Sequence, residues 1–297
     1  MTMISTNWAI GRGGSRREIL LRLSVHSSQS SPQVESGMTQ SIQEKPIRSS
    51  TAARNDLAEM LSQLYRDQLA REPRDQYIRD HSKPAFLNGS VRVFRFYEPY
   101  LPAQGRVLDW GCRHAPDSCL IRATAGNQLV LDGCDFMDPA CYSGFYEFAG
   151  LRYAQLRNAF QLPYEETAFD AVIASGVLEH AAMDYESLKE LYRVLKPGGR
   201  LILSYLPNRF SFAEWRLGRR NGGTGSDFHL RLYTRNQLRD LLLHTGFRPI
   251  ALGYQTQADL LRAETVRLHL LRPVLRLFFI HKLTSCICAI AEKQSIM

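Results

Sequence analysis

Two hydrophobic patterns alternate along the middle of the chain. Short apolar runs of the kind found in strands buried on both faces occur at "RVLDW", "QLVLDGCDF", "FDAVIASG", "RLILSYLP" and "RPIALGY". Segments with helical spacing lie between them, among them "APDSCLIRATAG", "YESLKELYRVLKPGG" and "TRNQLRDLLLHTGF". Strands that alternate with helices predict an α/β fold, with a doubly wound, mostly parallel sheet and helices on both faces.

The segments before this core have a different composition. Residues 1–54 are polar and Ser-rich, and we predict a disordered segment and linker. The arginines before Met38 loosely resemble an organellar transit peptide, and Met38 is an alternative translation start. Residues 55–104 are predicted to be helical, with Asn55 or Asp56 as a helix cap.

The core domain is predicted over residues 105–257. Within it, residues 206–232 form a long insertion that combines arginines and aromatic residues with a glycine-rich stretch, and we expect a lid over a substrate or a solvated basic loop. Residues 258–297 are predicted as a basic amphipathic helical tail, which packs on the protein or a partner or contacts an anionic membrane surface.

Composition narrows the class of protein. The 297 residues are 44% hydrophobic and 22% charged, which is ordinary for a globular protein, and the net charge of +8 does not choose among anionic partners. No run reaches the roughly 20 apolar residues that cross a bilayer. The six cysteines show neither a CxxC pair nor zinc-ligand spacing, so we predict no metal site, no disulfide framework and a reducing, cytoplasmic compartment.

Polar residues follow the predicted strands at one edge of the sheet. Asp109, Asp135 and the residues after Ser175 come at the carboxyl ends of parallel strands, where ligands of such sheets bind. An acid at Asp109, with no G-x-G-x-x-G, suits an ammonium group better than a pyrophosphate, or else Asp109 caps the turn. Asp135 is placed to accept ribose hydroxyls, with Asp132 and Asp138 as alternatives.

Four blocks of the sequence resemble a known family. They are "VLDWGC", "NAFQLPYEETAFDAVIASGVLEH", "LKELYRVLKPGGRLILS" and "HLRLYTRNQLRDLLLHTGF", between about Val107 and Tyr254. Together they resemble the class I S-adenosylmethionine-dependent methyltransferases, of the broad type that includes ubiquinone- and menaquinone-biosynthesis enzymes. The resemblance implies a Rossmann-like, seven-stranded sheet and S-adenosyl-L-methionine as cofactor.

The resemblance also implies roles for single residues. At the methionine end of the cofactor it implies Asp109, Gly111 and Cys112. At the ribose and adenine it implies Asp135, Phe136, Asn158 and Ala159, and at the sulfonium Ser175 and Gly176. Asn158 stands where the family more often has Asp, and its amide oxygen still accepts a hydrogen bond.

The turn after the first strand departs further from the family pattern. Arg113 and Ala115 replace glycines, and a non-glycine residue at positive φ costs about 1–2 kcal/mol. Arg113 either points outward or pairs with the cofactor carboxylate, for which a guanidinium is well suited. We expect cofactor binding to be altered and retained.

Candidate catalytic groups are two histidines. His180 lies by motif at the substrate mouth, or caps the next helix, and His229 follows the glycine-rich stretch of the insertion. Tyr205 and Tyr233 line the site or pack in the core. "GVLEH" replaces the Asn/Asp-Pro-Pro-aromatic pattern of nucleobase-methylating enzymes.

We therefore expect a small-molecule or lipid- or glycan-linked acceptor, methylated on oxygen or carbon, and no nucleic-acid partner. A non-catalytic scaffold with the same fold and a nucleic-acid methyltransferase are the alternatives. The oligomeric state does not follow from the sequence.

Overall fold

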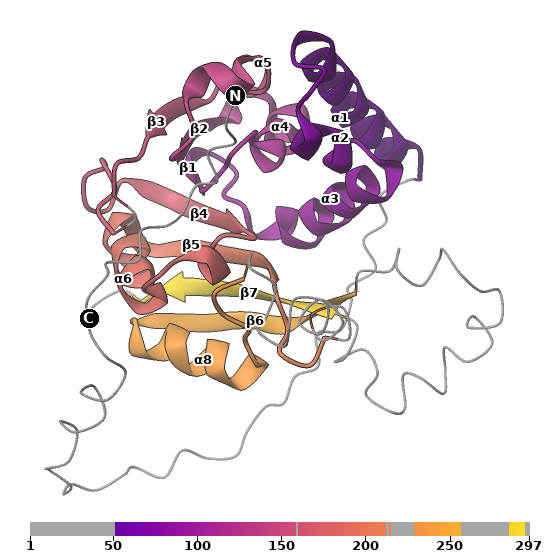
Figure 1. Ribbon diagram of the computed structural model, residues 1–297. Helices are drawn as coiled ribbons and strands as arrows, with labels where there is room; N and C mark the ends of the chain where they lie inside the picture. The colour runs from indigo at the N-terminus through magenta and orange to yellow at the C-terminus, as the bar shows by residue number, and fades with distance from the viewer. Residues whose placement is uncertain (1–50, 159, 212–213, 215–228, 257–284, 295–297) are drawn as a thin grey trace, which may run out of the picture. The chain divides into compact units, whose positions relative to one another are not determined.

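The computed structural model describes residues 51–158, 160–211, 214, 229–256 and 285–294. Helices form the first part (Figure 1), with bounds α1 Thr51–Arg71, α2 Gln76–His81, α3 Pro84–Tyr97 and a 3₁₀ turn at Glu98–Tyr100. The linker predicted through residue 54 is wrong at its end, because α1 begins at Thr51, where two alanines with high helix propensity follow. The rest of that prediction lies outside the described residues.

Seven strands form one sheet in the order β3-β2-β1-β4-β5-β7-β6. The bounds of the first five are β1 Gly105–Trp110, β2 Leu129–Asp135, β3 Arg152–Gln155, β4 Phe169–Ser175 and β5 Leu195–Leu206. These five pair in parallel. The predicted doubly wound, mostly parallel sheet is confirmed, and its strand order reverses at β1, where β4 pairs with the other side of that strand.

The last two strands are β6 Phe247–Thr256 and β7 Ser285–Lys293, and β7 is antiparallel to both neighbours. Figure 1 shows β7, in yellow, between β5 and β6. The helical tail predicted over residues 258–297 is therefore wrong for residues 285–293. In "SCICAIAEK", Ile287 and Ala289 face one side of the sheet and Ile290 the other, which is a strand buried on both faces. Residues 258–284 lie outside the described structure.

Helices cover both faces of this sheet. Their bounds are α4 Pro116–Ala125, α5 Ser143–Ala149, α6 Asp184–Val194 and α8 Arg235–His244. Alternate strand residues divide between two buried clusters, as the two-residue period of a strand requires: Val107 packs with α1, α3, α4 and α5, whereas Leu108 packs with α6 and α8.

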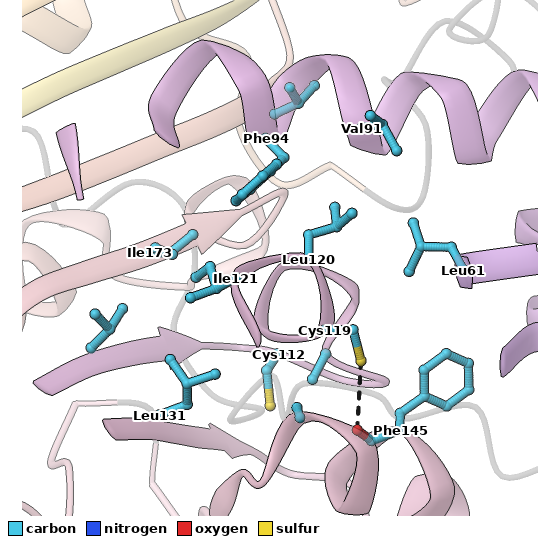
Figure 2. Packing of buried hydrophobic residues seen from close by; sticks show 14 of the residues in the cluster. Leu61, Val91, Phe94, Cys112, Cys119, Leu120, Ile121, Leu131, Phe145 and Ile173 are labelled. Atoms are coloured by element: carbon cyan, nitrogen blue, oxygen red, sulfur yellow. Dashed lines mark hydrogen bonds between the residues drawn. The ribbon is translucent and has the colours of Figure 1, made fainter. Parts of the chain in front are cut away.

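Figure 2 shows the first cluster, in which Leu131 and Ile173 from the strands face Leu120 and Ile121 of α4. The Cys119 thiol in the same cluster donates to a backbone carbonyl of α5 over 3.5 Å. None of the described helices has the length and hydrophobicity needed to span a bilayer.

Candidate functional site

The residues expected around the cofactor meet at the carboxyl edge of the sheet. Asp109 lies near the end of β1, Asp135 is the last residue of β2 and Ser175 is the last residue of β4. β1 pairs with both other strands, so their carboxyl ends are neighbours. Gly111 and Gly176 follow β1 and β4 with φ of +68° and +67°, a conformation that leaves room for a ligand close to the backbone.

The turn after β1 has the left-handed backbone conformation that glycine favours, although Arg113 and Ala115 stand there. Arg113 has φ +45° and Ala115, which begins α4, has φ +53°. Hydrogen bonds hold the turn at three points. The Arg113 N–H donates to Asp135 Oδ2 over 2.9 Å, the Tyr146 hydroxyl donates to the Arg113 carbonyl, and the Ala115 N–H donates to Cys112 O over 2.6 Å. These three hydrogen bonds offset part of the strain of the two left-handed residues.

The Arg113 side chain does not point outward, and its pairing with the cofactor carboxylate stays a prediction. Its guanidinium carbon lies 3.5 Å from the ring centroid of Tyr77 in α2, and the guanidinium also bonds to the Tyr142 hydroxyl. The Arg113 Nε is buried and has no hydrogen-bond partner among the described residues. An anionic group of a ligand at this edge would give this buried guanidinium N–H its missing partner.

The Asp109 carboxyl is almost fully buried and accepts a hydrogen bond from Ser118 Oγ over 2.7 Å. Burial and the nearby Asp117 raise the pKa of Asp109 above its usual value. Burial also raises the pKa of Asp117, although the Tyr97 hydroxyl donates to it. A ligand ammonium group beside Asp109 would supply the positive charge that the ionised form lacks.

Of the three acids on or just after β2, only Asp135 is placed for a ribose. Asp132 is buried and ion-paired with Arg106 at 2.7 Å and with Arg152 at 2.6 Å. Asp138 accepts from the backbone N–H two residues on and begins a 3₁₀ turn. Asp135 accepts the N–H groups of Arg113 and Phe136 and ends β2 at the carboxyl edge, so it stays the prediction for the ribose hydroxyls.

The other predicted cofactor residues differ in what their side chains offer. The Cys112 side chain packs in the core, so its backbone alone faces the edge. Phe136 is half-buried directly after Asp135, and Asn158 Oδ1 already accepts the Phe160 N–H over 2.8 Å. Ala159 lies outside the described residues.

The end of β4 connects this edge to a second group of polar residues. Ser175 Oγ lies 2.7 Å from Ser204 Oγ of β5, and a Cβ placed on Gly176 would lie 3.6 Å from Glu179 Oε1. Tyr205, the second-last residue of β5, has the strained φ of +59°.

The two candidate catalytic histidines are brought together there. The ring centroids of His180 and His229 lie 5.3 Å apart, and His180 Nε2 lies 3.9 Å from Glu179 Oε1. His229 Nδ1 lies 3.1 Å from Glu214 Oε2. Burial raises the pKa of Glu179 to about 7. Burial lowers the pKa of His229, but the hydrogen bond and charge of Glu214 outweigh it, so the pKa lies above its usual value.

Four residues that the structure places beside the two histidines or the turn after β1 were not predicted from the sequence. Glu179 stands next to His180 in "GVLEH", and its position in the motif was a usable signal. Glu214 and Tyr77 carry no local signal. His114 is buried with its Nδ1 unpartnered among the described residues, and burial holds its pKa well below the usual value. Tyr233, by contrast, is a buried packing residue bonded to Asp184.

Comparison with known proteins identifies the family of this chain. The family model described as "Methyltransferase domain" matches residues 83–252, more than half of the chain. The chain belongs to the class I S-adenosylmethionine-dependent methyltransferases. This methyltransferase is 28% identical over 122 residues to the ubiquinone/menaquinone biosynthesis C-methyltransferase UbiE of Geotalea daltonii, with 39% of this chain and 52% of the relative covered.

It is also 39% identical over 118 residues to a demethylmenaquinone methyltransferase of Thermus thermophilus, with 34% of this chain and 53% of the relative covered. The chain thus spans about half the length of these curated relatives. A crystal structure of a methyltransferase from Thermotoga maritima, a possible histamine N-methyltransferase, has a TM-score of 0.50 at 16% identity and covers 70% of this chain and 89% of its own. That likeness concerns the fold.

The residues present fit S-adenosylmethionine, the cofactor of this family. The observation that decides the fit is the pairing of opposite charges at one edge: a buried carboxyl at Asp109 for the ammonium, and the unpartnered Arg113 Nε for the carboxylate. Asp135 is placed for the ribose hydroxyls. Gly176 leaves the backbone open between this edge and the two histidines.

Proposed function

We propose that this methyltransferase methylates oxygen, or the carbon beside it, in an acceptor that carries a hydroxyl group, either a small molecule or one linked to a lipid or glycan. The observation that carries the proposal is the convergence of His180 and His229 beside Glu179, whose Oε1 would lie 3.6 Å from a Cβ placed on Gly176. Both reactions require the acceptor hydroxyl to lose its proton, since the alkoxide or phenolate makes the oxygen, or a conjugated carbon beside it, nucleophilic.

The chain's residues contribute binding, alignment and proton transfer. S-adenosylmethionine supplies, when bound, an electrophilic methyl group on a sulfonium. Asp109, Arg113 and Asp135 would fix the cofactor from three sides, and Gly176 lets the acceptor approach without a side chain between them. The histidine pair draws the proton from the acceptor hydroxyl while the new bond to the methyl group forms. Alignment contributes most to such displacements.

The relatives' names support the same class of acceptor. Both curated relatives described above are named as methyltransferases of quinone biosynthesis, and one is named a C-methyltransferase. Quinone precursors in their reduced form carry ring hydroxyl groups, which matches the chemistry required here. All six cysteines are free thiols, which supports our proposed cytoplasmic compartment. Peripheral membrane contact through residues 258–284 stays a proposal.

The first experiment is a calorimetric titration of S-adenosylhomocysteine into the purified chain. Methyl transfer from labelled S-adenosylmethionine to a panel of hydroquinones and phenolic acids follows. We expect micromolar binding and a labelled O- or C-methyl product. His229→Gln should lower kcat at least tenfold with the cofactor Kd unchanged, and His244→Gln, at an exposed helix end, is the matched control.

Each contrary result points to one alternative. Absence of S-adenosylhomocysteine binding would favour the scaffold. Labelling of RNA or DNA, with salt-sensitive binding, would favour the nucleic-acid methyltransferase. Full activity of His229→Gln would remove the histidines from the proposal and leave the cofactor assignment standing.

A further inference from the structure

We propose that Glu179, His180 and His229 form a binding site for one divalent transition-metal ion. Their potential ligand atoms all lie within 4.8 Å of one another. The spacing of cysteines and histidines along the chain predicts no metal site, because His229 is not close to Glu179 and His180 in the sequence. Here the ligands come from the connection after β4 and from the far end of the insertion, which only the fold brings together.

Glu179 supplies an observation independent of this clustering. Its side chain is 2% exposed, and its Oε2 atom is buried without a hydrogen-bond partner among the described residues. A buried carboxylate oxygen without a donor is costly unless a cation or a donor completes it. The other oxygen, Oε1, lies 3.9 Å from His180 Nε2, so the carboxylate faces the histidine cluster.

His229 is oriented as metal-binding histidines are. Its Nδ1 lies 3.1 Å from Glu214 Oε2, which leaves Nε2 as the ligand atom. A carboxylate on the outer nitrogen of a ligating histidine fixes the ring and increases its basicity. Glu214 is therefore a positioning residue and not a ligand.

The backbone next to His229 is fixed to the connection that carries the other two ligands. The Leu230 N–H donates to Glu179 O over 3.1 Å. The Arg231 guanidinium donates to the carbonyls of Ala181 and Ala182 and lies 3.2 Å from Asp184 Oδ2. The three ligand residues thus keep their separation while their side chains adjust.

The required adjustment is small. Ligand atoms at about 2.1 Å from a tetrahedral ion lie about 3.4 Å apart. The present separations of up to 4.8 Å therefore call for side-chain movements of about 1 Å, within one rotamer well. Two imidazoles and one carboxylate leave at least one coordination position open, as in catalytic sites.

The donor set also selects the ion. Imidazole nitrogen favours Zn²⁺, Fe²⁺ or Co²⁺ over Mg²⁺ and Ca²⁺, which prefer oxygen ligands. At the open position the ion would bind the acceptor hydroxyl and lower its pKa, so that the hydroxyl proton passes to solvent while the two histidines hold the ion and do not themselves take the proton. This role rests on the proposed function, whereas the metal site itself does not.

The test uses chelator-treated, untagged full chain and direct metal binding. Calorimetry with Zn²⁺ and the visible absorption of Co²⁺ should report one ion per chain, and millimolar Mg²⁺ should not compete. His229→Gln and Glu179→Gln should weaken Zn²⁺ binding at least 100-fold, and Glu214→Gln about 10- to 100-fold. His244→Gln, outside the cluster, should leave binding unchanged.

Melting curves confirm that each variant is folded, and His229→Gln serves if the buried Glu179→Gln variant does not fold. No Zn²⁺ binding by the parent chain, or binding that survives His229→Gln, would overturn the metal site. S-adenosylhomocysteine titration of the same metal-free sample keeps the two proposals separate. Turnover by the metal-free sample would refute the role of the ion in deprotonating the acceptor, whereas metal binding without methyl transfer would refute the proposed function alone.

Discussion

Gly111 tests how tightly the cofactor edge is built. It has φ +68°, and a Cβ added there would lie 2.5 Å and 2.7 Å from the two methyl carbons of Val177, just after β4. Gly111→Ala therefore combines a strained backbone with a steric clash between the turns that follow β1 and β4. Gly198 in β5 is the matched control, because it has φ +76° and nothing lies within 4 Å of its added Cβ.

The expected losses follow from these two terms. A left-handed alanine costs about 1–2 kcal/mol, and the reduced entropy of the unfolded chain returns about 0.4–1 kcal/mol. Gly198→Ala should therefore lower the free energy of unfolding by about 1 kcal/mol. Gly111→Ala adds overpacking of about 1–3 kcal/mol, for a total of about 2–4 kcal/mol. The pair Gly111→Ala/Val177→Ala should recover part of that difference, since it removes both methyl carbons.

Thermal or urea unfolding of the four proteins measures these values, with a shift of about 2–4 °C in Tm for each kcal/mol. S-adenosylhomocysteine titration of the same samples should show that Gly111→Ala also weakens cofactor binding, whereas Gly198→Ala does not. Equal destabilisation by the two single variants would refute the reasoning, because the clash with Val177 would then be absent. A double variant no more stable than Gly111→Ala would refute it in the same way.

Three further predictions concern the charged groups at this edge. Asp135→Asn should weaken S-adenosylhomocysteine binding at least tenfold in calorimetry, and should lower Tm because its single amide oxygen can accept only one of the two N–H groups, of Arg113 and Phe136, that Asp135 accepts; undiminished affinity would remove the ribose assignment. Arg113→Gly should relieve the strain at φ +45° and still lower that affinity about tenfold through loss of the guanidinium; unchanged affinity would limit Arg113 to packing on Tyr77. Since burial raises the pKa values of Asp109 and Asp117, the folded state keeps protons that the unfolded chain releases above about pH 4. Tm should therefore fall as pH rises from 4 through the neutral range, and less steeply in Asp117→Asn; parallel slopes would contradict the pKa directions.

Much of the fold was predictable because its signals are local. Buried parallel strands appear as apolar runs, and the turns between elements carry glycine and proline. The strand β7 was not predicted because the basic and apolar residues 258–284 precede it. Their pattern favours an amphipathic helix, and the prediction extended that helix to the end of the chain. Its position between β5 and β6 depends on pairing with strands distant in the sequence, which no local pattern specifies.

The candidate site was likewise predictable only where local sequence signals place its residues. Asp109, Asp135 and Gly176 follow strands, so the parallel sheet places them without further information. The sequence could not choose among Asp132, Asp135 and Asp138 as the ribose-binding acid. Asp132 forms ion pairs with Arg106 and Arg152, and these arginines lie on neighbouring strands that only the fold brings together. The pairing of His229 with Glu214 and His180 depends on how the insertion returns to the sheet.

The altered turn after β1 gives the N-terminal helices a role in the cofactor site. A turn built of glycines would adopt its left-handed conformation at little cost, whereas Arg113 and Ala115 together cost about 2–4 kcal/mol without compensation. The stacking of Arg113 on Tyr77 in α2 and the hydrogen bond from Tyr146 in α5 hold that conformation from outside the turn. Tyr77 and Tyr146 would not be needed to hold a turn made of glycines, but they are needed to hold this turn at the cofactor edge. Cofactor affinity should accordingly respond to substitution of Tyr77, which lies before the residues 83–252 that the family model matches.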